Sequence, residues 1–227
     1  MELNLSTETV NVLKNFSDIN QNLLIKPGNK IQTISNMKNI LAEAEIEEKF
    51  AKEFAIYDLP EFLRTYEMLE DPTLKFDSES YVNIIEKSSK GTDVDGFIYN
   101  FADKSVIVSP TKNITMPDTL VDFTLKKEQF AKFLRAVGTI NVPDVSVKGD
   151  GKTIKLIAHD KKNKSSNKYS ITLGETDKKF TANFKSENFK IIAGDYNIAL
   201  STAKISHFIN RNKPIQYWIA LEPDSEF

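Results

Sequence analysis

Hydrophobic and polar positions follow one repeated order along this chain. The segment Phe123–Val137 begins with strand-like alternation and continues with apolar residues at helical spacing, which predicts a short strand leading into a helix. The residues expected on the buried face of that helix are Phe130, Phe133, Leu134 and Val137. Lys132 and Arg135 fall on the opposite face, so the helix is predicted to be amphipathic.

Three further segments repeat this order. Leu3–Phe16 and Phe54–Met68 predict a strand and a helix, and Phe184–Ile192 is a shortened copy that Gly194-Asp195 interrupts. The expected inward residues are Val10, Leu13 and Phe16 in the first copy, and Phe62, Tyr66 and Leu69 in the second. The anchors Val10, Phe62, Phe130 and Phe189 recur at intervals of 52, 68 and 59 residues. Such recurrence predicts an α+β protein built from repeated units.

Between the predicted helices, alternating segments indicate strands. These are Leu23–Ile25, Lys30–Ile34, Ile40–Ile46, Thr73–Phe76, Tyr81–Glu86, Gly96–Phe101, Val145–Val147, Thr153–Ala158, Tyr169–Leu173, Tyr196–Leu200 and Ile215–Leu221. Ser6 and Asp58 are expected as helix N-caps, and 148–151 as a hairpin turn. The pattern loosens over 102–121, where two prolines lie. We therefore expect domains at 1–108 and 122–227, with a connector at 109–121.

Composition narrows the class of protein. The 227 residues include no cysteine, which excludes a disulfide framework and a thiol nucleophile. There is no signal-peptide pattern and no apolar run near the ~20 residues that span a bilayer, so we expect a soluble intracellular protein. Residues 1–110 carry 11 Lys and Arg against 19 Asp and Glu, a net of −8, whereas residues 111–227 carry 19 against 13, a net of +6. This asymmetry predicts a basic surface on the second half, unless the halves differ without functional consequence.

No catalytic motif is present. The two histidines, His159 and His207, lack a neighbouring GxSxG elbow, and no HExxH, CxxC, phosphate-loop or dinucleotide motif occurs. The acidic run at 43–48 could hold a metal, although a solvated strand face is the more usual explanation for such a run. A hydrolase that uses carboxylates and a metal remains one alternative, because paired acids need no set spacing.

Basic residues recur on the outward faces of the predicted helices. A single outward lysine is usually only solvated, but the recurrence predicts a shared basic surface. Its expected members are Lys14, Arg64, Lys132 and Arg135, with Lys126 and Lys127 at one rim. Glu61, Glu67 and Glu128 lie on the same faces and dilute the charge.

The chain as a whole resembles the DNA polymerase sliding clamps of myovirus-type tailed bacteriophages, relatives of the proliferating cell nuclear antigen. The residues that carry this resemblance are 56–59 (IYDL), 102–105 (ADKS) with Ile107, Val108 and Pro110, 169–173 (YSITL) and 219–225 (IALEPDS). These residues form no chemical motif, so the resemblance depends on their order and spacing.

The resemblance implies a DNA clamp fold with two similar domains per chain. It also implies a closed homotrimeric ring whose helices line a central hole around double-stranded DNA, without sequence specificity and without catalysis or a cofactor. The implied partners are the replicative DNA polymerase, an ATP-driven clamp loader and late-transcription proteins, in the cytoplasm of a bacterial host. The alternative is a DNA- or protein-binding subunit of the same fold that does not encircle DNA. The shortened fourth copy leaves open whether 203–211, or nothing, lines that quarter of the hole.

Two further surfaces follow from this reading. Exposed strand edges need partners, so we expect Phe97–Phe101 of one chain to meet Tyr169–Leu173 of the next, with Phe97, Phe101, Tyr169 and Ile171 as contacts. The connector is too apolar for a plain tether and is expected to drape over the second domain. The residues expected to border a hydrophobic groove for apolar peptide tails are Val106, Ile107, Val108, Ile114 and Met116. The alternative is that the connector only seals the domain junction.

Overall fold

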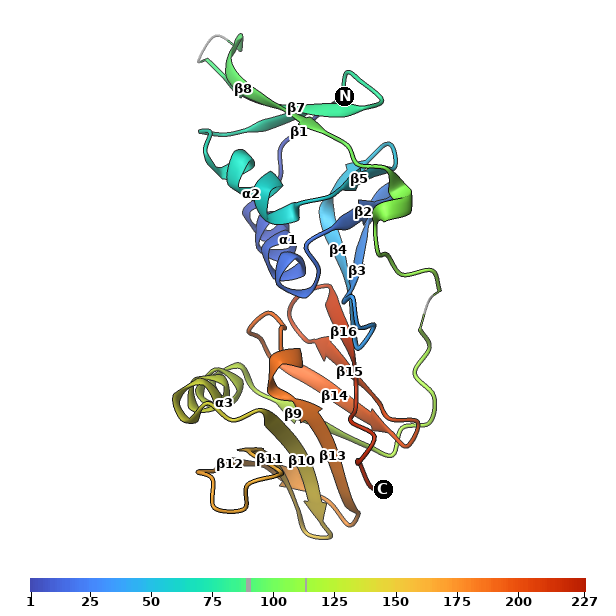
Figure 1. Ribbon diagram of the computed structural model, residues 1–227, viewed down its shortest axis with the longest axis vertical. Helices are drawn as coiled ribbons and strands as arrows, with labels where there is room; N and C mark the ends of the chain where they lie inside the picture. Colours follow the sequence, from blue (N-terminus) through green and yellow to red (C-terminus); the bar gives the residue numbers. More distant parts are fainter. Residues whose placement is uncertain (89–90, 113) are drawn as a thin grey trace. The chain divides into compact units, whose positions relative to one another are not determined.

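The computed structural model describes residues 1–88, 91–112 and 114–227, without the side chain of Val94. It divides into two compact units, Met1–Thr111 and Lys112–Phe227. In each unit, helices lie beside antiparallel strands (Figure 1), which confirms the predicted α+β class. Among the described residues, no helix is long and apolar enough to cross a membrane.

The first unit contains two α-helices among short strands. Its elements are β1 (Glu2–Leu3), α1 (Thr7–Ile19), β2 (Leu23–Ile25), β3 (Gly28–Ile34), β4 (Ile40–Phe50), β5 (Phe54–Ile56), α2 (Leu59–Glu67), β6 (Thr73–Lys75), β7 (Tyr81–Lys87), β8 (Asp93–Asn100) and the 3₁₀ turn η1 (Lys104–Val106). One sheet has the order β1-β6-β7-β8, so β8 is an edge strand. β3 pairs with β4, and β2 pairs with β5.

Both helices of the first unit start at the predicted caps. Ser6 Oγ accepts a hydrogen bond from the Thr9 amide at 3.2 Å, and Asp58 Oδ1 accepts one from the Glu61 amide at 2.8 Å. Glu48, from the acidic run, also accepts from the hydroxyl of Thr9 and from the amide of Ser6. Although burial opposes ionisation, these bonds lower the pKa of Glu48 below its ordinary value. This carboxylate is therefore a second cap of α1 and not part of a solvated strand face.

The second unit has one α-helix beside two four-stranded sets of strands. Its elements are β9 (Val121–Leu125), α3 (Lys127–Ile140), β10 (Asp144–Asp150), β11 (Thr153–His159), β12 (Tyr169–Glu175), β13 (Lys179–Lys185), the 3₁₀ turn η2 (Ser186–Asn188), β14 (Tyr196–Ser201), β15 (Ile205–Asn210) and β16 (Ile215–Ala220). Strands β12, β11, β10 and β13 pair in that order, and so do β9, β14, β15 and β16.

Aromatic side chains of α3 join the core of the second unit. Phe130 and Phe133 are fully buried, as the helical spacing predicts. The Phe130 ring lies 6.3 Å from the rings of both Phe189 and Tyr196, and the Phe133 ring lies 6.2 Å from that of Tyr169. These contacts determine the rotation of α3, because turning the helix would expose both phenylalanines to water.

The shortened fourth copy does not form an α-helix. Its first residues belong to β13, and the chain then makes only the η2 turn before Phe189 enters the aromatic core. The segment 203–211, considered as an alternative lining of the hole, instead contains β15, which the sequence reading missed. Ser206 and Asn210 lie buried beside Phe208 on the inner face of β15, so its alternation does not follow the usual polar-out pattern.

Two boundaries in the second unit differ from expectation. Helix α3 continues past Gly138 to Ile140 and ends where Asn141 takes a left-handed conformation with φ of 47°. The β10–β11 turn lies beyond Asp150, two residues later than predicted, because Asp150 Oδ1 accepts the amides of Lys152 and Thr153. Lys148 is consequently a strand residue.

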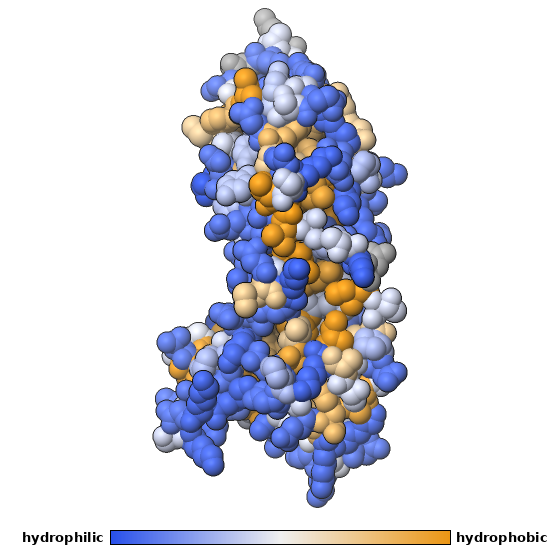
Figure 2. Space-filling model, turned by 45° about the vertical axis from the view of Figure 1, so that its right-hand side comes forward, coloured by the Kyte–Doolittle hydropathy of each residue, from blue (hydrophilic) through white to orange (hydrophobic). Residues whose placement is uncertain are grey.

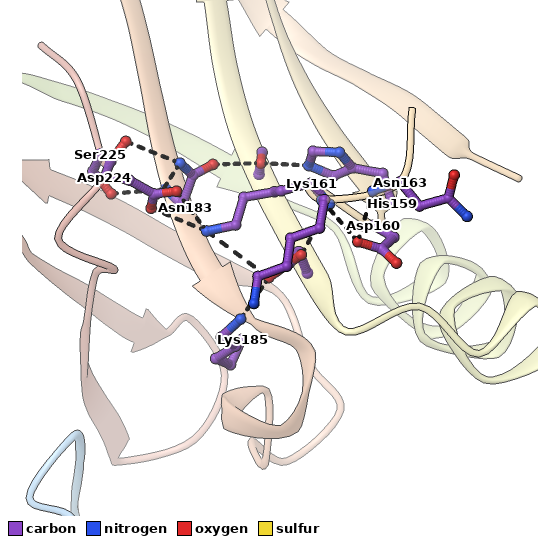
Figure 3. Close-up of polar contacts among 11 residues, drawn as sticks. His159, Asp160, Lys161, Asn163, Asn183, Lys185, Asp224 and Ser225 are labelled. Carbon is purple, nitrogen blue, oxygen red and sulfur yellow. Dashed lines mark hydrogen bonds and ion pairs between the residues drawn. The ribbon is translucent and has the colours of Figure 1, made fainter. Parts of the chain in front are cut away.

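The C-terminal residues attach to the free edge of β13 rather than extending into solvent. Thr181 and Glu226 exchange two backbone hydrogen bonds of 2.8 Å, and the Asn183 amide donates to Ser225 Oγ at 3.0 Å. Asp224 forms an ion pair with Lys161 at 2.8 Å (Figure 3). The polar segment 160–168, which follows β11, is thus tied to the C-terminal residues through Lys161.

Beneath these contacts lies a buried polar network (Figure 3). Ser146 Oγ donates to Asn183 Oδ1 at 2.6 Å, so the Nε2 nitrogen of His159 donates to Ser146 at 2.7 Å. Burial, followed by the nearby charge of Lys148, lowers the pKa of His159 and favours this neutral form. Asn183 Nδ2 continues the network to Asp224.

Asp144 is the buried carboxylate of the same region. Its side chain is 3% exposed and accepts hydrogen bonds from Lys185 Nζ at 2.8 Å and from the Lys161 amide at 3.0 Å. Burial raises the pKa of Asp144, but the bond from Lys185 and that from the Lys161 amide outweigh it, so the pKa lies below the ordinary 3.8. A carboxyl with a depressed pKa stabilises the fold above its unfolded pKa and loses that contribution as pH falls through its folded pKa.

We expect Asp144→Asn to lower the free energy of unfolding by roughly 1–2 kcal/mol at pH 7, because a charged partner of Lys185 is lost. The difference from the wild type should shrink as pH falls below the ordinary pKa of 3.8, because the unfolded chain then binds a proton that folded Asp144 resists. Urea unfolding at several pH values measures both quantities. An equal difference at pH 7 and pH 3 would show that ionised Asp144 does not stabilise this unit.

Candidate nucleic-acid interface

The exposed face of α3 carries a cluster of cations. Lys132 and Arg135 lie one helical turn apart and are exposed, directly above the buried Phe130 and Phe133. Neither cation forms an ion pair within the described part of the chain. The fixed aromatic face below therefore holds both charges towards solvent, as the sequence predicts.

The N-terminus of α3 adds two more cations in an electrostatically unfavourable position. Lys126 is the N-cap residue and Lys127 opens the helix, where the helix dipole disfavours positive charge. Asp195 compensates, because its Oδ1 accepts the Lys127 amide at 2.7 Å. That bond, chiefly, lowers the pKa of Asp195 and keeps the carboxylate ionised.

Arg211 joins this group, although sequence reasoning did not assign it to the site. Its backbone amide donates to the Asp195 carbonyl at 2.9 Å, and its charge also lowers the pKa of Asp195. The carboxylate of Asp195 is thus influenced by the charges of Lys126 and Arg211 and accepts the backbone amide of Lys127. The sequence signal was weak, because Arg211 follows a strand whose existence the pattern did not predict.

The helices of the first unit carry less positive charge. Lys14 on α1 pairs with Glu67 on α2 at 2.5 Å, so its charge is largely neutralised. Arg64 is exposed and forms no ion pair within the described residues, but α1 and α2 each contain one cation and two acids. The predicted basic surface is therefore unequal: it is strong on α3 and weak on α1 and α2.

The connector residues divide between inward and outward positions. Ile107 is buried in the first unit, and the Val108 backbone bonds to the side chains of Asn20 and Asn22 at 3.1 and 3.0 Å. This part of the connector lies on the first unit, so the prediction that it covers the second unit is wrong for these residues. Val106 is 51% exposed, and Ile114 and Met116 are half-buried. On the face shown in Figure 2, hydrophobic residues interrupt the mostly polar surface of the protein.

The four predicted subunit contacts lie on or beside edge strands. Phe97 belongs to β8, and Phe101 follows it directly, while Tyr169 and Ile171 belong to β12. Within the residues that the structure describes, each of these two strands has one hydrogen-bonding edge without a partner strand in its own unit. Ile98 on β8 is 65% exposed and stands beside a shallow groove that Asp93 and Asp95 also line.

Comparisons with known proteins give a consistent family. Residues 6–109 match the family described as DNA polymerase processivity factor, and residues 122–223 match the family described as gp45 sliding clamp, C terminal. The sliding clamp of Vibrio phage KVP40 is 32% identical, over 97% of this chain and 99% of the relative. The sliding clamps of Escherichia phage RB69 and Enterobacteria phage T4 are each 29% identical, over 98% of both chains.

Solved structures show the same fold at low sequence identity. The proliferating cellular nuclear antigen of Entamoeba histolytica superposes with a TM-score of 0.69 at 14% identity, over 97% of both chains. A structure of the PCNA2–PCNA3 complex of Sulfolobus tokodaii gives a TM-score of 0.70 at 12% identity, over 97% of this chain and 98% of the other. The chain therefore belongs to the sliding-clamp family, whose members are non-enzymatic DNA polymerase processivity factors.

Proposed function

We propose that three copies of this chain close into a ring that encircles duplex DNA and slides along it while tethering the replicative polymerase. The exposed cations of α3 carry the proposal, because they can attract phosphates but present no arrangement for reading bases. A ring holds DNA by topology, so weak contacts that exchange rapidly are sufficient. The role would be played inside the bacterial host cell, in its cytoplasm.

The ring closes, on this proposal, by pairing β8 of one copy with β12 of the next. Both are open edges, whereas the C-terminal residues already cover the edge of β13. An exposed Ile98 on an edge strand is a liability in a monomer and is buried by such pairing. The first unit carries a net −8 and the second a net +6, so a head-to-tail contact brings opposite charges together.

The polymerase and other partner proteins are proposed to bind the connector one at a time. Val106 is an exposed apolar residue beside Ile107, which anchors the segment to the first unit. The backbone of this segment is therefore held in place while one apolar side chain points outward. Such a surface could bind a short apolar tail of the polymerase or of a late-transcription protein. An ATP-driven loader would open the ring for DNA to enter.

A subunit of the same fold that does not encircle DNA is the second candidate. No particular observation favours it, and the oligomeric state distinguishes the two. A non-encircling subunit needs no closed trimer, and it would leave a nicked circular DNA as readily as a linear one.

The ring predicts a species of three chain masses in native mass spectrometry at micromolar concentration. Ile98→Asp should produce folded monomers, because Ile98 is exposed in the single chain and its replacement removes no packing within it. Met37→Asp, at a residue that is 84% exposed in the β3–β4 turn, is the matched control and should stay trimeric. Wild-type protein that sediments only as a monomer would contradict ring closure.

The DNA-facing role predicts that Lys132→Glu combined with Arg135→Glu weakens binding to duplex DNA of any sequence. Folding should change by no more than about 0.5 kcal/mol, since both residues are exposed. Two lost phosphate contacts should reduce the slope of log K against log salt by about 2. Anisotropy titrations between 50 and 200 mM salt measure this slope, and an unchanged slope would remove both residues from the interface.

The connector role predicts different results for two neighbouring substitutions. Val106→Ser should weaken binding of an apolar tail peptide of the polymerase while the melting temperature holds, because Val106 is exposed. Ile107→Ser should lower the melting temperature, because Ile107 is buried. If Val106→Ser leaves peptide affinity unchanged, the connector only seals the domain junction.

A further inference from the structure

Two neighbouring lysines of the second unit lie on the sheet face opposite α3. Along β10, Val145 and Val147 turn towards the core, where Phe133 of α3 contacts Tyr169 of β12. The alternation of a strand then turns Ser146 and Lys148 to the other face. Sequence reasoning assigned the charge of this half to the helix and overlooked the sheet.

The register sets two of these lysines directly side by side. Lys148 on β10 is the cross-strand partner of Lys155 on β11. Thr181 on β13 flanks the first, and Thr172 on β12 flanks the second. A row of hydroxyl, ammonium, ammonium and hydroxyl groups therefore crosses all four strands, and below we name it the lysine row.

This arrangement is unfavourable without an anion. Like charges directly opposite each other destabilise a strand pair. Within the residues that the structure describes, neither Lys148 nor Lys155 forms an ion pair. Asp150 feels the charge of Lys155, but its pKa is lowered mainly by the turn amides of Thr153 and Lys152, which its Oδ1 accepts at 2.8 and 2.9 Å. The row thus has an excess of positive charge that an anionic ligand would balance.

The chain's own C-terminal residues already lie along the edge of this sheet, beside the row. They form an extended acidic segment that bridges to Thr181, a member of the lysine row. Asp224 of that segment pairs with Lys161 at 2.8 Å, and Ser225 accepts from Asn183 (Figure 3). An acidic peptide in extended form is therefore already bound at the border of the row.

Nucleic acid fits the row less well. Single strands bind flat surfaces by stacking bases on aromatic side chains as well as by charge. The aromatic residues of these four strands, Tyr169, Phe180 and Phe184, are cross-strand partners of core residues and so lie on the opposite face. The lysine row offers charge and hydroxyl groups but no stacking surface.

We infer that the lysine row, Thr172-Lys155-Lys148-Thr181, is a docking site for an extended acidic segment of a partner protein, lying beside the chain's own C-terminal residues. Its carboxylates would bind the two ammonium groups, and the threonine hydroxyls would donate to neighbouring oxygens. The inference does not depend on the proposed encirclement of DNA, because the row and α3 lie on opposite faces of the sheet.

The test uses the full-length protein and a fluorescein-labelled deca-glutamate peptide at 50 mM salt. Lys148→Gln combined with Lys155→Gln should weaken binding at least tenfold. Lys132→Gln combined with Arg135→Gln removes the same charge from α3 and is the matched control, with affinity for the peptide within twofold of the wild type. Relief of the like-charge contact also predicts that the first double variant melts no lower than the wild type in the absence of peptide.

Three results would overturn the inference. Equal losses in both double variants would show attraction by net charge alone. No measurable binding to the wild type would show that the row is not a docking site. Loss of binding to a 20-nucleotide single-stranded DNA in the Lys148/Lys155 variant, with peptide binding retained, would reassign the row to nucleic acid. Duplex binding in the two variants separates this site from the proposed function, since that function needs only the α3 residues.

Discussion

The burial of two phenylalanines on α3 is the constraint on which the candidate interface depends. Phe130 and Phe133 are fully buried against rings from β12, β14 and the segment after η2. Burying each large aromatic side chain is worth about 2–3 kcal/mol, far more than exposed charges gain by any particular orientation. Packing therefore decides which way α3 faces, and Lys132 and Arg135 are carried to the surface as a consequence.

At the start of α3, two positively charged residues lie where they lower the stability of the helix. Two lysines at a helix N-terminus oppose the dipole, and a protein selected only for stability would prefer acids there. Asp195, from the turn before β14, restores part of the loss by accepting the Lys127 amide. The cations at this end of α3 therefore carry an electrostatic cost that a residue from a distant segment partly offsets.

Helical spacing and the helix caps made much of this fold predictable from the sequence. Phe62, Phe130 and Ser6 have the roles that their patterns indicate, because each interaction is local or depends on one amphipathic face. Strand β15 escaped prediction because Ser206 is buried, with its hydroxyl donating to the Ile219 carbonyl at 2.7 Å. A serine in a sequence is normally taken as a surface residue. Its burial here depends on an acceptor from another strand, which the sequence pattern does not indicate.

The sequence predicted that the second half carries excess positive charge, but not where on the fold that charge lies. The excess of cations in the second half was evident, yet Lys148 and Lys155 became neighbours only through the register of β10 and β11. That register follows from the Asp150 turn, which lies two residues beyond the one expected. Similarly, the pairing of Lys14 with Glu67 depends on how α1 packs on α2, and no spacing rule connects residues 53 positions apart.

The unequal helices bear on how a clamp of this sequence would hold DNA. Each phosphate contact steepens the slope of log K against log salt by about 0.9. Many cations around a duplex would therefore bind it tightly and slow its movement. Here α1 and α2 are each slightly acidic, and attraction falls to α3 and the few cations around Asp195. On the proposed ring, attraction would alternate with weak repulsion around the hole. A duplex would then be centred without being bound firmly at any point, and topology would supply the retention that affinity does not.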